Sequence, residues 1–111
     1  SKIDWEKIAS KLPTVKSDAD QKAKRKELFK QFDPNGNGYL SLAEVDKGCR
    51  DVLELDEIFD VKPVIMRAFQ AAKGAGNRKG KTSKHGPDFV EWREFRLLLV
   101  YLRQYFEVWQ M

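Results

Sequence analysis

The amino-acid sequence predicts an all-α fold, with two helix–loop–helix units, an extra N-terminal helix and a long C-terminal helix. Two observations support this prediction. Apolar residues recur at helical spacing in several stretches, and segments rich in glycine or proline at 33–38 and 73–88 separate them. With 111 residues, of which 41% are hydrophobic and 12% aromatic, the chain is long enough for one domain with a core of its own.

Within the first 16 residues, 3–12 are predicted to form a short amphipathic helix that Pro13 stops. Trp5 of this helix is expected to dock on the rest of the domain. The next helix is expected to have Ser17 as its N-cap, with Asp20 three residues on, and to run to about Phe32. The basic run at 22–26 is interpreted as the outer face of this helix.

Three further stretches complete the helical prediction. One helix begins near Ser41, where Ser41 and Glu44 form a Ser-x-x-Glu capping pattern. An irregular or briefly helical connector at 55–61 follows it. A third helix uses Pro63 in its first turn. The last helix begins near Glu91 and continues to the end of the chain. The apolar stripe of the third helix consists of Val64, Ile65, Ala68, Phe69 and Ala72.

The segment 33–44 has the spacing of an EF-hand calcium loop. Such a loop places oxygen ligands at positions 1, 3, 5, 7, 9 and 12 and glycine at position 6. Gly38 occupies position 6, where the backbone must turn sharply. Because Ca²⁺ is a hard cation that takes oxygen ligands, the pattern predicts a calcium site. Its predicted ligands are Asp33, Asn35, Asn37, Tyr39 through its backbone carbonyl, Ser41 and Glu44.

A second, degenerate loop is predicted at about 73–94. Counting back from Glu94 as position 12 places Ser83, His85 and Pro87 at positions 1, 3 and 5, and these residues cannot supply the acidic half of a cage. We therefore expect a structural role for this loop, with a short strand at 89–90 pairing with 39–40. The predicted division is a helical segment at 1–16, an EF-hand pair at 17–101 and the start of a further helix at 102–111.

These features together resemble the N-terminal half of the kinetoplastid flagellar calcium-binding proteins, the calflagins. The resemblance is carried by residues 26–33, 44–49, 52–57, 67–69 and above all 88–97. It implies four EF-hands in the complete family pattern, of which this sequence holds two. It also implies a calcium switch on the cytoplasmic side of the flagellar membrane, with N-terminal acyl groups whose Met-Gly start this sequence does not contain.

Composition restricts the partners. The 21 Lys and Arg against 17 Asp and Glu give a net charge of +4, which favours anionic surfaces without identifying one. No groove-reading motif accompanies the charge, so nucleic acid is not expected. Cys49 is the only cysteine and is expected in the core. It excludes an internal disulfide, which suits a reducing compartment such as the cytosol.

The sequence favours a non-enzymatic calcium sensor, because no catalytic constellation accompanies the calcium loop. Two alternatives remain open. One is a structural interaction module in which calcium is incidental, and the other is a membrane adaptor that uses the basic face. The apolar C-terminal helix is a candidate surface for a protein partner or for a homodimer.

Overall fold

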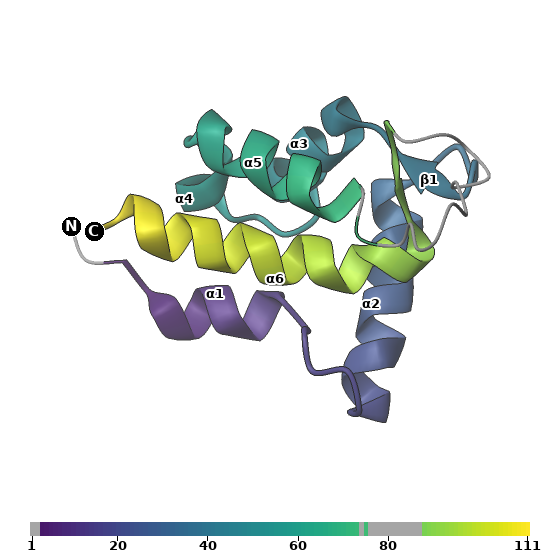
Figure 1. Cartoon of the computed structure of the whole chain (residues 1–111). Coiled ribbons are helices and arrows are strands. Elements are labelled where there is room, and N and C mark those ends of the chain that lie inside the picture. The colour runs from purple at the N-terminus through teal and green to yellow at the C-terminus, as the bar shows by residue number, and fades with distance from the viewer. Residues whose placement is uncertain (1–2, 74, 76–87) are drawn as a thin grey trace.

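The computed structural model describes residues 3–73, 75 and 88–111, and within them it is mainly helical (Figure 1). The predicted all-α class is therefore confirmed. In chain order the elements are α1 (Trp5–Lys11), α2 (Ala19–Phe32), β1 (Tyr39–Leu40), α3 (Leu42–Asp51), α4 (Asp56–Phe59), α5 (Lys62–Lys73), β2 (Val90–Glu91) and α6 (Trp92–Trp109).

The two helix–loop–helix units are joined by a minimal antiparallel sheet. Leu40 of β1 is paired with Val90 of β2, and Tyr39 is paired with Glu91. Leu40 and Val90 are both fully buried, so the sheet contributes to the core as well as joining the loops. The pairing of Leu40 with Val90 agrees with the prediction, but the second strand begins one residue later than expected. Phe89 instead places its ring 4.6 Å from that of Tyr39.

Aromatic rings from α2 and α6 form the centre of the core. The centre of the Phe95 ring lies 5.3 Å from the centre of the Phe29 ring and 5.4 Å from that of the Phe32 ring. Both pairs have the edge-on geometry that aromatic rings favour. Trp92 adds a further edge contact to Phe29. The apolar stripe predicted for the third helix is buried on α5, as expected, and packs within the same core.

The N-cap of α2 differs from the predicted one. Asp18, not Ser17, caps the helix, and its Oδ1 accepts hydrogen bonds from the backbone N–H groups of Asp20 at 2.9 Å and Gln21 at 3.1 Å. A carboxylate accepts both bonds and also favours the positive end of the helix dipole. The helix therefore begins one residue later than the serine pattern indicated.

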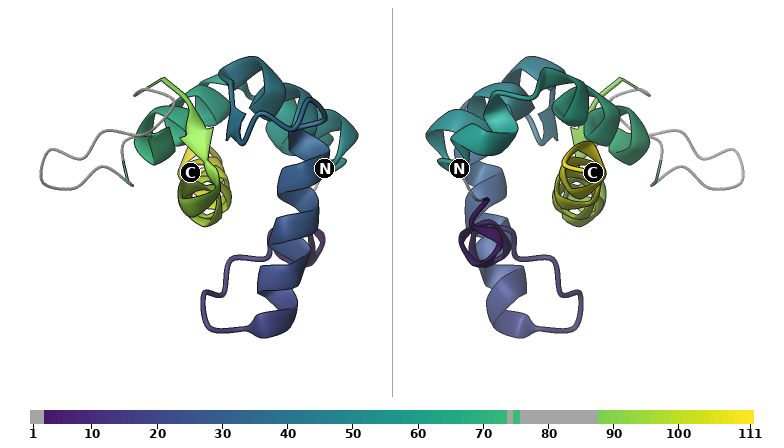
Figure 2. Two further views of the ribbon diagram at one scale, coloured as in Figure 1. Left: turned by 90° about the vertical axis from the view of Figure 1, so that its right-hand side faces the viewer. Right: turned by 90° about the vertical axis from the view of Figure 1, so that its left-hand side faces the viewer.

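Helix α1 runs in the opposite direction to α6 (Figure 1). As predicted, Trp5 docks on the domain, with its ring 5.6 Å from that of Phe106. Ile8 is fully buried. Lys7 forms an ion pair of 2.9 Å with Glu57 of α4. Figure 2 shows α2 standing to one side of α6 and bridged to it by α3, α4 and α5.

The interpretation of 22–26 as an outer face is wrong for Arg25. This side chain is only 4% exposed, and its Nη1 donates to the carbonyl oxygens of Pro13 at 2.9 Å and Val15 at 3.0 Å. Arg96 of α6 donates to the carbonyl oxygen of Thr14 at 3.3 Å. Two arginines from different helices therefore hold the segment that joins α1 to α2.

Helix α6 is continuous across position 102, where the start of a further helix was expected. Its last turn exposes Val108 and Trp109, and Met111 beyond it is also exposed. Among the described residues, no helix combines the length and the apolar character needed to cross a membrane.

Candidate metal centre

The first half of the 33–44 loop is shaped by Asp33. Its backbone N–H ends α2 by donating to the carbonyl oxygens of Phe29 and Lys30. Its carboxylate turns into the loop and accepts the N–H of Asn37 at 3.1 Å and of Gly38 at 2.8 Å. The side chain is nearly buried, at 6% exposure. One carboxylate therefore closes the turn in which the remaining donors lie.

Two glycines allow this turn. Gly36 has φ of 66° and Gly38 has φ of 87°, values that residues with a Cβ adopt at a cost. Gly38 occupies the sixth position of the loop, the position for which the sequence pattern requires glycine. The backbone conformation there matches the reason for that requirement.

The second half of the loop leads directly into α3. Ser41 is the N-cap of α3, and its Oγ accepts the N–H of Glu44 at 3.2 Å. Glu44 Oε1 in turn accepts the N–H of Ser41 at 2.9 Å. This reciprocal capping box satisfies two backbone donors at the start of the helix, and it confirms the predicted Ser-x-x-Glu cap. It also fixes Glu44 in the first turn of α3.

The structure brings the two charged candidate ligands to opposite ends of one loop. Asp33 follows the last residue of α2, and Glu44 is the third residue of α3. Between them, Asn35 and Asn37 are exposed, whereas Tyr39 and Ser41 are partly buried. Within the described ranges, no three His, Cys, Asp or Glu side chains are grouped so that they could hold a metal ion. Of the candidate donors, only Asp33 and Glu44 are charged, and the others are neutral amide, carbonyl or hydroxyl oxygens.

A hollow of about 360 Å³ adjoins this loop, between the end of α2 and α3. Glu44 lines it together with Asn35, Lys47 and Asp51. Helices α2 and α3 approach closely beside it, as Gly48 shows: a Cβ added there would overlap the ring of Phe32. The sequence analysis did not identify this contact, since a helical glycine carries no apolar signal.

In the part that the structure describes, the second loop has the same kind of cap as the first. The N–H of Glu91 donates to Glu94 Oε1 at 3.0 Å in a capping box at the start of α6, and Glu94 is fully buried. Asp88 is exposed and forms an ion pair of 3.4 Å with Lys73. The predicted positions 83, 85 and 87, including His85, lie outside the described residues.

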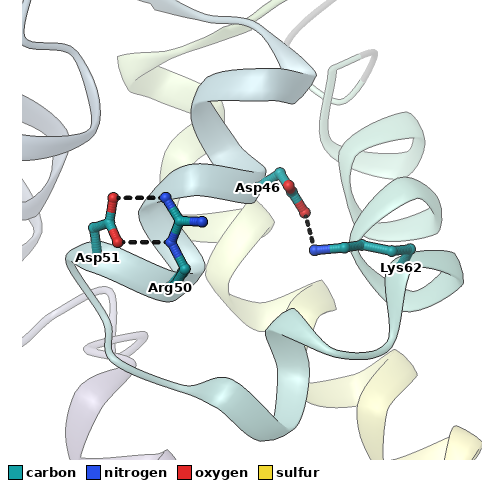
Figure 3. Close-up of polar contacts among 4 residues, drawn as sticks. All are labelled: Asp46, Arg50, Asp51 and Lys62. Atoms are coloured by element: carbon teal, nitrogen blue, oxygen red, sulfur yellow. Dashed lines mark hydrogen bonds and ion pairs between the residues drawn. The ribbon is translucent and has the colours of Figure 1, made fainter.

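A polar cluster joins α3 to α4 and α5 (Figure 3). Lys62, the first residue of α5, places its Nζ 2.8 Å from Asp46 Oδ1 on α3. The same Nζ lies 3.1 Å from the centre of the Phe59 ring. Arg50 of α3 lies 5.3 Å from the centre of that ring and is paired with Asp51 at 2.8 Å. The sequence gives no signal for this cluster, because Asp46 and Lys62 are 16 residues apart.

Cys49 is a core residue, as predicted. It is fully buried on α3, and burial raises the pKa of its thiol to about 12. Because the thiolate is the reactive form of cysteine, we expect the Cys49 thiol to be unreactive in the folded protein.

Two helix–loop–helix units joined through a two-stranded sheet, with a twelve-residue oxygen-donor loop in the first, define a paired EF-hand domain. The chain belongs to the FCaBP EF-hand domain family, whose model matches residues 8–102. This membership confirms the resemblance that the sequence suggested.

The chain is also similar to named trypanosomal proteins. It is 44% identical over 108 residues to flagellar calcium-binding protein TB-17 of Trypanosoma brucei brucei, covering 96% of this chain and 45% of that protein. Identity to TB-24 of the same organism is also 44%, covering 96% and 48%. Identity to the flagellar calcium-binding protein of Trypanosoma cruzi is 43% over 105 residues, covering 94% and 48%. The chain therefore spans about half the length of these relatives.

Proposed function

We propose that this chain binds one calcium ion in the 33–44 loop and acts as a non-enzymatic calcium sensor. The observation that carries the proposal is the conformation of the loop. The Asp33 carboxylate accepts two loop amides, the glycine at the sixth position has positive φ, and Glu44 is fixed in the first turn of α3. The names of the relatives, which are calcium-binding proteins, support the same assignment.

The donor set suits calcium and indicates moderate affinity. Six oxygens would hold the ion, from Asp33, Asn35, Asn37, the Tyr39 carbonyl, Ser41 and Glu44. Calcium takes six to eight oxygen ligands, and the charge of the ligands tunes its affinity. Because only Asp33 and Glu44 are charged, we expect a dissociation constant of roughly 10⁻⁶ to 10⁻⁴ M.

The same geometry explains how binding would act on the fold. Asp33 ends α2 and Glu44 begins α3, so drawing the two carboxylates toward one ion changes the relation between these helices. A movement of α3 relative to α2 would also change the close contact between Gly48 and Phe32. In EF-hand sensors, a change in the angle between the two helices of a hand exposes apolar surface, and in this chain α3 is the helix that would move.

The decisive experiment is calorimetric titration of the chain with Ca²⁺, comparing wild type with Glu44→Gln. We expect one site in the wild type and at least a tenfold weaker site in the variant, because one of two charged ligands is lost. Glutamine also serves in a capping box, so the variant should keep its fold, which circular dichroism would check. No binding at millimolar Ca²⁺, or equal affinity in the variant, would reject the proposal.

We extend the proposal to location and partners. The relatives are named flagellar proteins, and we propose that this chain belongs to the flagellum, at the cytoplasmic face of its membrane. The exposed lysines of α2 offer a basic surface for anionic lipid, worth about 1 kcal/mol per residue near the surface. These lysines are Lys22, Lys24, Lys26 and Lys30.

Sedimentation with vesicles tests the membrane part of this extension. Vesicles containing phosphatidylserine should retain the chain better than neutral vesicles, and added salt should weaken the binding. Equal sedimentation with both lipids would contradict it.

The exposed apolar end of α6, at Val108, Trp109 and Met111, is the proposed surface for a protein partner or a second copy. Analytical ultracentrifugation of wild type and Trp109→Ser would test self-association.

A further inference from the structure

We propose that Lys62 is a positioning residue that couples the calcium loop to the second hand, although it does not belong to the loop. In this proposal the contacts of Lys62 tie α3 to α5, so α3 cannot respond to calcium alone. The inference rests on the proposed calcium binding at 33–44. It predicts that Lys62 lowers calcium affinity and carries the response to α5.

The two charged ends of the loop belong to differently anchored helices. Asp33 ends α2, which is held to α6 by the ring contacts of Phe29 and Phe32 with Phe95. Glu44 lies in the first turn of α3, whose Asp46 pairs with Lys62 of α5 and whose Arg50 lies over the Phe59 ring of α4. A change in the distance between the two carboxylates therefore displaces α3 relative to the pair formed by α2 and α6.

Apolar side chains of α3 and α5 pack in one core, and the polar tie between the two helices passes through one ammonium group. Lys62 Nζ lies 2.8 Å from Asp46 Oδ1 and 3.1 Å from the centre of the Phe59 ring. Asp46 lies two residues after Glu44, within the first turns of α3. Arg50, one turn further along α3, lies over the same ring. Asp46 of α3 therefore contacts the first residue of α5 (Figure 3), and Arg50 of α3 contacts the last residue of α4.

Helix α5 leads toward the second hand. It packs along α6 in the core, and Arg67 of α5 lies 5.7 Å from the centre of the Tyr105 ring of α6. If α3 moves with Lys62 attached, α5 must shift against α6. The work of that shift opposes calcium binding, and by linkage the occupied loop favours the shifted position of α5.

Exposed ion pairs and cation–π contacts are individually weak, so we expect a modest effect. Lys62→Met keeps the aliphatic stem on Phe59 and removes the charge. It should bind Ca²⁺ about two- to fivefold more tightly than wild type, while Lys62→Arg should remain within twofold of wild type. The amide resonances of Val64, Ile65 and Ala68, which shift with calcium in the wild type, should shift less in Lys62→Met.

Loss of a positive charge also attracts calcium without any coupling, and Lys47→Met is the matched control for this effect. Lys47 is exposed on α3, three residues after Glu44, so its charge is nearer the loop than most. The control should leave the calcium response of the α5 amides unchanged. A second, metal-free test is a double-mutant cycle between Asp46→Asn and Lys62→Met, in which unfolding is measured in chelator and the two effects should be non-additive.

Each outcome decides the proposal. Tighter binding with a diminished α5 response in Lys62→Met alone, together with non-additivity in chelator, supports it. Unchanged or weaker binding, an equal loss of response in Lys47→Met, or an additive cycle overturns the coupling but leaves calcium binding intact. A wild-type chain that takes up no calcium overturns the proposed function, and the coupling with it.

Discussion

Replacing Gly48 with alanine has two opposite effects on the stability of the fold. Gly48 lies within α3, where alanine is the better helix former by about 1 kcal/mol. Its added Cβ, however, would overlap the edge of the Phe32 ring. That ring is only 2% exposed, and its centre lies 5.4 Å from that of Phe95, so its movement away from the added methyl group is restricted on the core side.

The magnitude follows from these two terms. Inserting a methyl group into a well-packed contact costs about 1–3 kcal/mol, and we take about 2 kcal/mol because the obstructing group is a rigid ring. Subtracting the gain in helix propensity of about 1 kcal/mol leaves a net destabilisation of about 1 kcal/mol. For a domain of this size, that corresponds to a fall in the melting temperature of about 5 °C.

Thermal unfolding followed by circular dichroism in the presence of chelator would measure this change. The double variant Phe32→Leu with Gly48→Ala is the control, because the smaller side chain makes room for the methyl group. Its loss of stability should be less than the sum of the two single losses. A Gly48→Ala variant that melts above the wild type would refute the reasoning, since helix propensity alone would then dominate.

Three further predictions concern the buried side chains of Arg25 and Cys49. Arg25→Met should lower the free energy of unfolding by about 1–3 kcal/mol in urea, because the Pro13 and Val15 carbonyls lose their donor. The exposed neighbour Lys24→Met should stay within about 0.5 kcal/mol of wild type, and equal losses in both variants would contradict the assignment. Cys49 should resist a thiol reagent at pH 8 until the chain unfolds, because its thiol has a pKa of about 12; complete labelling of the folded chain within seconds would count against this. Stability should also fall as the pH rises above the ordinary thiol value of 9.0, since the unfolded state then ionises first.

Features with local signals were predicted well from the sequence. The N-cap at Ser41, its reciprocal bond to Glu44 and the buried stripe on α5 depend on residues three or four positions apart. The helical period or a cap motif specifies such features directly. The pairing of Leu40 with Val90 was also found, because both loops could be counted from their twelfth positions. The six proposed calcium ligands remain a prediction.

Features that depend on distant segments were missed or misplaced. Arg25 lies in a lysine-rich run and appeared to be a surface residue, yet the segment after α1 folds back and presents its carbonyl groups to it. The misplaced cap of α2 is an exception, because Asp18 contacts only the nearby amides of Asp20 and Gln21, and the local pattern did not decide between it and Ser17. Neither the close approach of Gly48 to Phe32 nor the bridge from Asp46 to Lys62 can be read from a local pattern, because each requires the packed arrangement of two helices.

The two bonds from Asp33 to the amides of Asn37 and Gly38 make the entrance of the loop a preorganised half-cage. For the proposed calcium site, this half would need little further ordering of the backbone on binding, so most of the conformational cost would fall on the side of Glu44. Changes at 33–38 should therefore distort the resting loop itself. Glu44→Gln, which can keep the capping box with Ser41, should leave that resting shape intact and weaken only the proposed calcium binding.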